Sequence, residues 1–341
     1  MSFLVGKIVE EVVAGAPNNG EGVDNTGTVK RLKVGRDVHP YVSAQAFRRW
    51  LRDSLPTDEP RSGVTRSGSG SNQQAYTAGR PDQFLDDDLF GYMVAVKKQN
   101  YQRDTVLATG TLVSVVPQRP TTDFGTMSRG FGAGENPVIH QHELYSAVLA
   151  GDLLLDLPRV GVFETDGSGL RISISEAIAK EAVTAGAEEI TFRGVSAVRL
   201  ALPERRRRVA VLFQALAALR GGAKRSLHYG DRTPALLVLA PMKGGVNPFT
   251  RVLGAREGKP VFDPDVLAQE IKAWEDELDG PVRIGWAPGF LGDQQKSVSH
   301  DLADLIAKGQ VVIDHPRVLL RRLANEVEEG KHDGWFEDRP A

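Results

Sequence analysis

Four polar side chains near the N-terminus have the types and spacing needed to bind an extended anion. These side chains share one face only if a helix begins at Ser43. The hydroxyl of Ser43 can accept a hydrogen bond from a free backbone N–H group of the first turn. Positions i, i+3, i+4 and i+7 of that helix share one face, and they are Gln45, Arg48, Arg49 and Arg52. The pattern predicts a phosphate-binding helix; alone, it is also typical of a solvated basic face on a surface helix.

The same helix needs an apolar face that packs on a core. Ala44, Phe47, Leu51 and Leu55 recur at the helical period and form a separate stripe. We therefore predict an amphipathic helix with one face turned to the core and one face turned to a ligand.

Three other segments offer groups that a nucleic-acid backbone requires. Residues 18–22 are rich in Asn and Gly and offer backbone N–H groups with little side-chain bulk. Cations for phosphates and flat rings for unstacked bases are the usual ingredients of single-strand RNA recognition. The two segments that combine them carry Arg129 with Phe131, and Lys224 and Arg225 with His228 and Tyr229.

Composition bounds the class of protein. The chain has 341 residues, 41% hydrophobic and 25% charged, which are ordinary values for a soluble globular protein. It contains no cysteine, so disulfides and thiolate chemistry are excluded and a reducing cytoplasm is indicated. No apolar run approaches the ~18 residues that a membrane span needs, and the N-terminus lacks a signal-peptide pattern. We expect a soluble, cytoplasmic protein with no membrane partner.

The charge is distributed unevenly along the chain. The net charge is only −2, but residues 28–52 carry seven Lys and Arg against one Asp, a net charge of +6. Residues 263–341 carry a net charge of −8. This polarity predicts one basic and one acidic surface, which could also meet between copies of the chain.

Candidate catalytic groups do not form a recognisable active site. His140 and His142 could suggest a metal site, but the context predicts a loop that enters a helix, where positions i and i+2 diverge, and further ligands at suitable spacing are missing. Nucleotide-binding, nucleophile-elbow and zinc-protease motifs are also missing from the sequence. We therefore predict a non-enzymatic protein without a metal or cofactor.

Two charge runs are expected at the surface. The triplet at residues 86–88 is acidic and is typical of a solvated entrance to a strand. The run at residues 205–208 consists of four arginines at the start of a helix, where cations oppose the helix dipole. We expect this run on a solvated or inter-subunit surface.

The pattern of elements predicts an α+β fold. Its order favours a single RRM-like or ferredoxin-like core that carries long insertions. Residues 57–82 are polar and rich in Ser and Gly, which predicts a flexible insertion. Strands are expected at residues 3–13, 28–34, 88–96, 106–116, 159–164, 234–240 and 282–286, and helices from Ser43 and at 143–150, 203–219, 265–278 and 311–329.

An ordered set of short motifs resembles a known family, the DevR-type backbone subunit of type I CRISPR effector complexes (Cascade), most closely type I-B. The resemblance covers roughly residues 1–290, and the acidic C-terminal part is the least diagnostic. The motifs lie at residues 19–22, 30–31, 41–49, 88–93, 123–126, 143–147, 155–161, 221–224 and 247–249.

The resemblance implies an RRM-like palm, spanning residues 1–341, with inserted finger and thumb segments. It places the finger at residues 57–82 and the thumb within residues 160–260. It implies a non-catalytic subunit whose copies polymerise along the crRNA, with other Cascade subunits and the target DNA strand as partners. The protein would hold the RNA backbone while base pairing reads the sequence. The predicted RNA-binding residues are Asn19, Lys30, Arg31, Ser43, Gln45, Arg48, Arg49, Arg52, Arg129, Lys224, Arg225 and His228.

Other functions remain open from the sequence. A ribonuclease of the same superfamily would need an acid for a metal or a histidine as base, and His140 or Asp123 are the nearest candidates. A DNA-binding autoregulator would bind duplex DNA without RNA, although no helix-turn-helix pattern supports it. A transposon-associated effector is also compatible with the sequence.

Overall fold

One large, mostly antiparallel sheet organises the molecule. The computed structural model describes residues 2–22, 26–69, 73–96, 99–127, 129–132, 134–136, 138–166 and 172–338. Its central strand β1 (Phe3–Gly15) lies between β12 (Val138–Asp156) and β16 (Leu236–Met242), antiparallel to both. Next to β12 lies β10 (Leu112–Ser114), also antiparallel. The order β16–β1–β12–β10 is that of a ferredoxin-like βαββαβ unit, so the predicted α+β, RRM-like class is confirmed.

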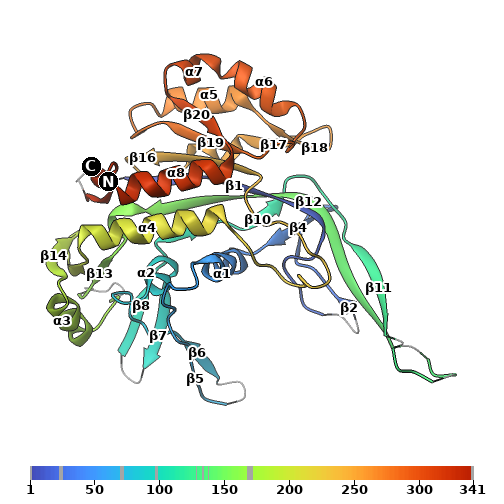
Figure 1. The fold of residues 1–341 in the computed structure, drawn as a ribbon, viewed down its shortest axis with the longest axis horizontal. Coiled ribbons are helices and arrows are strands. Elements are labelled where there is room, and N and C mark those ends of the chain that lie inside the picture. The colour runs from blue at the N-terminus through green and yellow to red at the C-terminus, as the bar shows by residue number, and fades with distance from the viewer. Residues whose placement is uncertain are drawn as a thin grey trace.

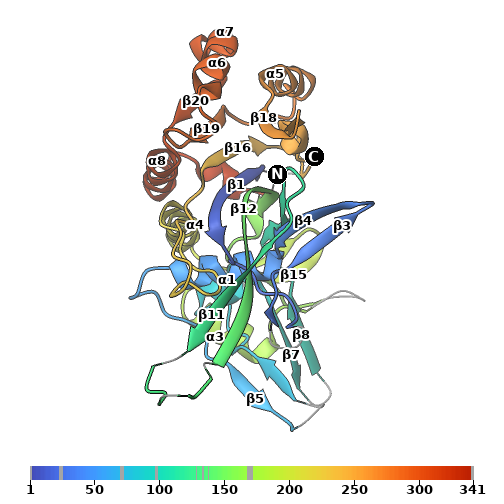
Figure 2. The ribbon, with the colours of Figure 1, turned by 90° about the vertical axis from the view of Figure 1, so that its right-hand side faces the viewer.

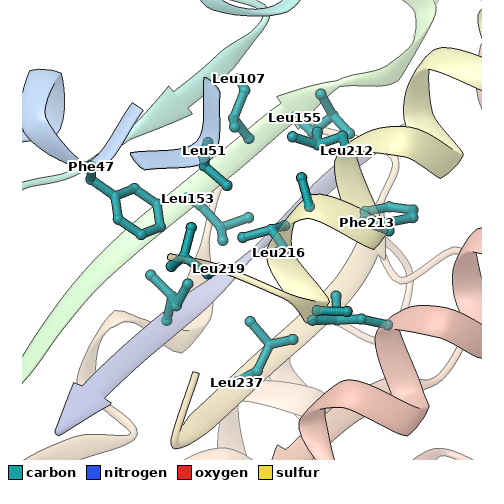
Figure 3. Packing of buried hydrophobic residues seen from close by; sticks show 14 of the residues in the cluster. Phe47, Leu51, Leu107, Leu153, Leu155, Leu212, Phe213, Leu216, Leu219 and Leu237 are labelled. Carbon is teal, nitrogen blue, oxygen red and sulfur yellow. The ribbon is translucent and has the colours of Figure 1, made fainter. Parts of the chain in front are cut away.

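The two helices of this unit cover one face of the sheet. They are α1 (Ala44–Ser54), which follows β1, and α4 (Leu202–Ala217), which follows β12. A third helix, α8 (Pro316–Glu328), packs beside α4 on the same face, as Figure 2 shows. Leucines and phenylalanines from β1, β12, α1 and α4 interlock in this core (Figure 3).

Strand β1 is buried on both faces, which explains its nearly continuous apolar sequence. Ile8 contributes to the core under α1 and α4. Val9 faces the core on the opposite side of the sheet, to which helix α5 (Pro264–Ala273) contributes. Gly6 is required where β1 meets β16, because a Cβ there would lie 1.8 Å from the carbonyl oxygen of Val238.

The sheet extends at both edges, and the remaining elements are insertions. Beyond β16 lie β19 (Val282–Trp286) and β20 (Val311–Asp314), and beyond β10 lie β4 (Asp37–Val42) and β3 (Arg31–Val34). Strands β2 (Thr26–Gly27) and β9 (Leu107–Thr109) also pair with β12. The inserted elements are β5 (Thr65–Ser67), β6 (Gln74–Tyr76), α2 (Leu85–Phe90), β7 (Tyr92–Val96), β8 (Gln99–Arg103), β13 (Val162–Glu164), α3 (Glu176–Thr184), β14 (Glu188–Phe192), β15 (Val195–Arg199), β17 (Leu253–Arg256), β18 (Lys259–Phe262), α5 (Pro264–Ala273), α6 (Gln294–Asp301) and α7 (Ala303–Ala307).

One hairpin projects from the body of the molecule. Strand β11 (Thr121–Met127) pairs with the first half of β12, and the two form an arm that extends beyond the sheet (Figure 1). The second half of β12 pairs with β1. The arm and the palm therefore share one strand of 19 residues.

Several predicted elements are confirmed, and four are wrong in whole or in part. The first strand, the helix from Ser43, the helix at 203–219 and the strand at 282–286 are present. The helix predicted at 143–150 is part of β12, because pairing with β1 and β11 overrides the local preference of these residues. The strand predicted at 88–96 begins only at Tyr92, after helix α2, and the strand predicted at 106–116 is divided into β9 and β10. The helix predicted at 311–329 begins only at Pro316, after strand β20.

The acidic run and two of the four arginines of the basic run, Arg205 and Arg208, are buried, which contradicts the prediction of a solvated strand entrance and of a solvated or inter-subunit surface. Asp88 is fully buried, and its carboxylate binds Arg103 at 2.5 Å and Arg208 at 2.7 Å. Arg205 is also buried; its guanidinium donates to the carbonyl oxygens of Val160 and Pro158. The Asp88–Arg208 pair therefore joins α2 to α4, and Arg205 joins α4 to the turn at residues 158–160.

The remaining arginines of the run are partly exposed but are also paired. Arg206 binds Asp333, and Arg207 binds Glu59 at 2.6 Å and Glu204 at 2.7 Å. Among the residues that the structure describes, no helix is long and apolar enough to cross a membrane.

Candidate nucleic-acid interface

The N-terminus of α1 is joined to two of the other predicted RNA-binding segments. The hydroxyl of Ser43 caps the helix by accepting from the backbone of Ala46, as predicted. The backbone N–H of Ser43 donates to the side chain of Asn18 at 3.0 Å, and the N–H of Lys30 donates to the Asn18 carbonyl oxygen at 3.1 Å. Asn18 thus holds the loop, the helix and Lys30 together. The sequence predicted only backbone N–H groups from residues 18–22 and no role for the Asn18 side chain, although Asn in a Gly-rich turn is a recognisable signal.

The basic face of α1 is divided between paired and unpaired arginines. Arg49 binds Asp53 at 2.9 Å, and Arg52 lies 3.4 Å from Asp86 with its guanidinium over the ring of Phe90. Their charges are largely compensated within the protein. These two predicted residues are therefore less available to an anion than the sequence suggests.

Arg48 keeps its charge unpaired. Its guanidinium donates to the hydroxyl of Thr109 at 3.1 Å and has no carboxylate partner in the described part of the chain. Partial burial, and then the neighbouring Arg52, lowers the pKa of Arg48. An anion beside this group would relieve that repulsion. Gln45 is exposed one turn earlier and lacks a side-chain partner among the described residues.

The glycine-rich loop, residues 221–230, packs against α1. Gly221 has a φ of +143°, and a Cβ there would lie 2.7 Å from the ring of Trp50. Next along the loop, the N–H of Ala223 donates to the carbonyl oxygen of Pro17 at 2.9 Å. The contact with Trp50 needs glycine at position 221, because a side chain there would separate the loop from the helix.

The cations of this loop lie beside β2. Lys224 directs its ammonium group to the carbonyl oxygen of Gly27 at 3.3 Å, and burial lowers its pKa. Arg225 is exposed, and its side chain is without a partner among the described residues. His228 lies against the ring of His142, with centroids 4.9 Å apart.

Three predicted residues occupy other positions. Arg31 binds Glu143 at 2.9 Å, so its charge is compensated. Asn19 is exposed and forms a backbone bridge with Val29. Arg129 is exposed and follows β11, two residues after Met127.

The structure thus joins four segments that are distant in the sequence: residues 16–22, Lys30, helix α1 and the glycine-rich loop. Within the described residues, the cations of this surface without an acidic partner are Lys30, Arg48 and Arg225, and Lys224 contacts a neutral carbonyl oxygen. Such a surface can neutralise phosphates along a strand. Within the described ranges, no group of three or more His, Asp and Glu side chains could hold a metal ion.

Comparison with known proteins identifies the fold. The sequence matches no family model and no curated protein. A chain of a CRISPR RNA-guided surveillance complex superposes with a TM-score of 0.53 at 13% identity, over 95% of this chain and 98% of that chain. Our chain has that fold. A chain of such a surveillance complex described as pre-nicking has a TM-score of 0.56 at 10% identity, over 95% of this chain and all of that one. Because the likeness spans nearly both whole chains, it includes the insertions as well as the palm.

Proposed function

We propose that this protein is a non-catalytic, crRNA-binding backbone subunit of a type I CRISPR surveillance complex, of the DevR type and subtype I-B. Its copies line up along the guide RNA, hold the phosphate backbone and support pairing of the guide with the target DNA strand. The partners are the crRNA, the target strand, other copies of the chain and other Cascade subunits.

One observation carries this proposal: four segments from distant parts of the sequence converge on one surface that carries unpaired cations. The contacts of Asn18 join three of them, and the contacts of Gly221 and Ala223 add the fourth. The likeness in fold to chains of CRISPR RNA-guided surveillance complexes supports it. In this assignment Arg48, Lys224 and Arg225 contact phosphates, and Gln45 and Asn19 contribute neutral hydrogen bonds.

The insertions are assigned within the same proposal. Residues 57–82, which include the hairpin β5–β6, form the finger; residues 70–72 lie outside the described residues. The thumb lies within residues 160–260, where β14–β15 and β17–β18 are the two described hairpins that could form it. Residues 167–171 of that range are outside the described residues.

The test is RNA binding by the purified full-length chain. Fluorescence anisotropy with several unrelated labelled single-stranded RNAs should show binding, and Arg48→Ala or Lys224→Ala should weaken it for every sequence. Each lost phosphate contact should lower the salt slope by about one. Lys296→Ala is the matched control, because Lys296 is exposed, is paired with Asp293 and lies on α6, outside the four segments and both assigned insertions.

The same assay separates the alternatives. If RNA does not bind, or if both variants bind as tightly as the control, the surface is not an RNA track. If labelled RNA is cut when Mg²⁺ is added, the protein is a ribonuclease. If duplex DNA binds in preference to RNA, the autoregulator is correct.

A further inference from the structure

Three histidine rings lie in a row where the arm joins the palm. The rings of His140 and His142 stack with centroids 6.4 Å apart, and the ring of His228 lies 4.9 Å from that of His142. His140 and His142 come from β12, whereas His228 comes from the glycine-rich loop. We call these three residues the histidine row. The site described above uses only its outer member, His228.

The inner ring is oriented by a carboxylate. Asp123 is the cross-strand partner of His142 on β11, and its Oδ2 lies 3.3 Å from Nε2 of His142. A carboxylate in this position fixes the tautomer, so Nε2 of His142 carries the proton and Nδ1 is left as an acceptor. That Nδ1 is buried and has no hydrogen-bond partner among the described residues.

The adjacent ring also has a buried nitrogen without a hydrogen-bond partner among the described residues. This nitrogen is Nε2 of His228. Lys224 precedes His228 by one turn, and the backbone N–H of His228 donates to the Lys224 carbonyl oxygen at 2.8 Å. Burial, His142 and Lys224 together lower the pKa of His228, so its ring is neutral at pH 7 in the free protein.

The row is built into the arm. His140 covers Gly125, its partner across the hairpin, and a Cβ at that glycine would lie 2.2 Å from Nε2 of His140. Glu143 binds Arg31 at 2.9 Å and also acts on Lys224, whose pKa it raises, although burial outweighs this effect. Lys224, Asp123, Glu143 and the three rings are therefore the titratable groups that decide the charge of this cluster.

We propose that the histidine row, with Lys224, is a proton-linked phosphodiester site. The inference rests on the proposed function. When a phosphate of the bound strand lies beside Lys224, the ring of His228 takes up one proton from solvent. The phosphate neutralises Lys224 and favours the imidazolium, while Asp123 stabilises the inner ring. No bond is made or broken in the RNA.

The consequence is a pH dependence of RNA affinity with a defined sign. The free protein holds His228 neutral and the complex holds it charged, so affinity rises as the pH falls. One linked proton sets a limit of about tenfold in affinity per pH unit. Phosphodiesters do not titrate near neutral pH, so the dependence comes from the protein.

The experiment measures binding of the full-length chain to labelled single-stranded RNA from pH 5.5 to 8.5 at fixed ionic strength. Wild type should bind more tightly at lower pH, by roughly threefold to tenfold per unit in the steep part. His228→Asn should still bind through α1 but with a flat profile. His300→Asn, on exposed helix α6, is the control and should keep the wild-type slope. Calorimetry in two buffers of different ionisation enthalpy counts the protons taken up.

Each outcome decides a different point. Binding that changes less than twofold between pH 6 and 8, or a slope that His228→Asn retains, overturns the proton-linked site and leaves the proposed function intact. Absence of RNA binding at every pH overturns the proposed function itself. Strand cleavage that depends on His228 overturns the site as a binding element, since the ring would then act as a base.

Discussion

The buried carboxylate of Asp88 provides the sharpest test of how this fold is held together. We expect Asp88→Asn to destabilise the protein by about 3 kcal/mol, because it removes a buried carboxylate that two buried arginines share. Asp88 binds both Arg103 and Arg208, and it also accepts from the N–H of Gly161 at 3.0 Å. The exposed fractions of the three charged side chains are 0%, 0% and 1%.

The arginines cannot escape to water when the carboxylate is lost. Arg103 also donates to the carbonyl oxygens of Asp88, Val162 and Arg159, which keep its guanidinium in place. Arg208 also keeps Glu204 at 2.8 Å, and Arg103 lies 3.7 Å from Glu164. The loss therefore belongs at the lower end of the range for a broken buried pair, which is still large compared with a total stability of about 5–15 kcal/mol.

Urea unfolding followed by tryptophan fluorescence measures this loss, because Trp50, Trp286 and Trp335 are buried. Asp53→Asn is the matched control: it removes the exposed pair with Arg49, which should contribute at most about 1 kcal/mol. If Asp88→Asn loses no more than this control, the buried network does not stabilise α2 against α4, and the reasoning is refuted.

Three further predictions concern the candidate interface and the stability of the fold. Arg52→Ala should lower the free energy of unfolding by about 1–3 kcal/mol in urea, because it leaves the buried Asp86 without its cation; wild-type stability would contradict the pairing. Gly221→Val should release the glycine-rich loop from Trp50 and weaken RNA binding without changing the affinity ratio between RNA sequences; wild-type affinity and an unchanged rate of limited proteolysis in the loop would show that the contact is unnecessary. Burial outweighs the nearby Arg232 and raises the pKa of Glu10 to about 8, so the folded state binds a proton that the unfolded state releases near pH 4.5. Stability contributed by Glu10 should therefore fall as the pH rises from 4.5 through 8, by up to about 1.4 kcal/mol per unit, and Glu10→Gln should remove this fall in urea midpoints; parallel pH profiles for the two proteins would contradict it.

Local signals account for the elements that the sequence predicted. Ser43 caps α1 through its own hydroxyl, and Phe47 and Leu51 repeat at the helical period that buries them. Neither feature depends on a distant partner. The RRM-like order was also accessible, because β1, α1, α4 and β16 each have such a local pattern.

Long-range pairing accounts for the failures. Residues 143–150 have helix-forming character, but they are drawn into β12 by β1, more than 130 positions earlier in the chain. The buried state of Asp88 depends on Arg208, 120 positions away. Charge runs look solvated when the partners that bury them are not visible in the sequence.

The candidate site was predicted in outline, with errors of the same origin. The residues of the cap, the basic helix and the glycine-rich loop do converge. The compensation of Arg52 by Asp86 and of Arg31 by Glu143 could not be foreseen, because each pair joins separate segments. Asn18, which connects the segments through its hydrogen bonds, carries no charge and was therefore not distinguished in the sequence from the other residues of its loop.

The strand that the arm and the palm share determines how force passes through the molecule. β12 is about 60 Å long at the usual rise per residue, and its partner changes from β11 at Leu144 to β1 near Tyr145. No loop interrupts the strand at this change of partner. Because the strand is continuous, a displacement of the arm is transmitted through β12 to its hydrogen bonds with β1. A ligand bound near His142 would restrain the arm and the central strand pair together.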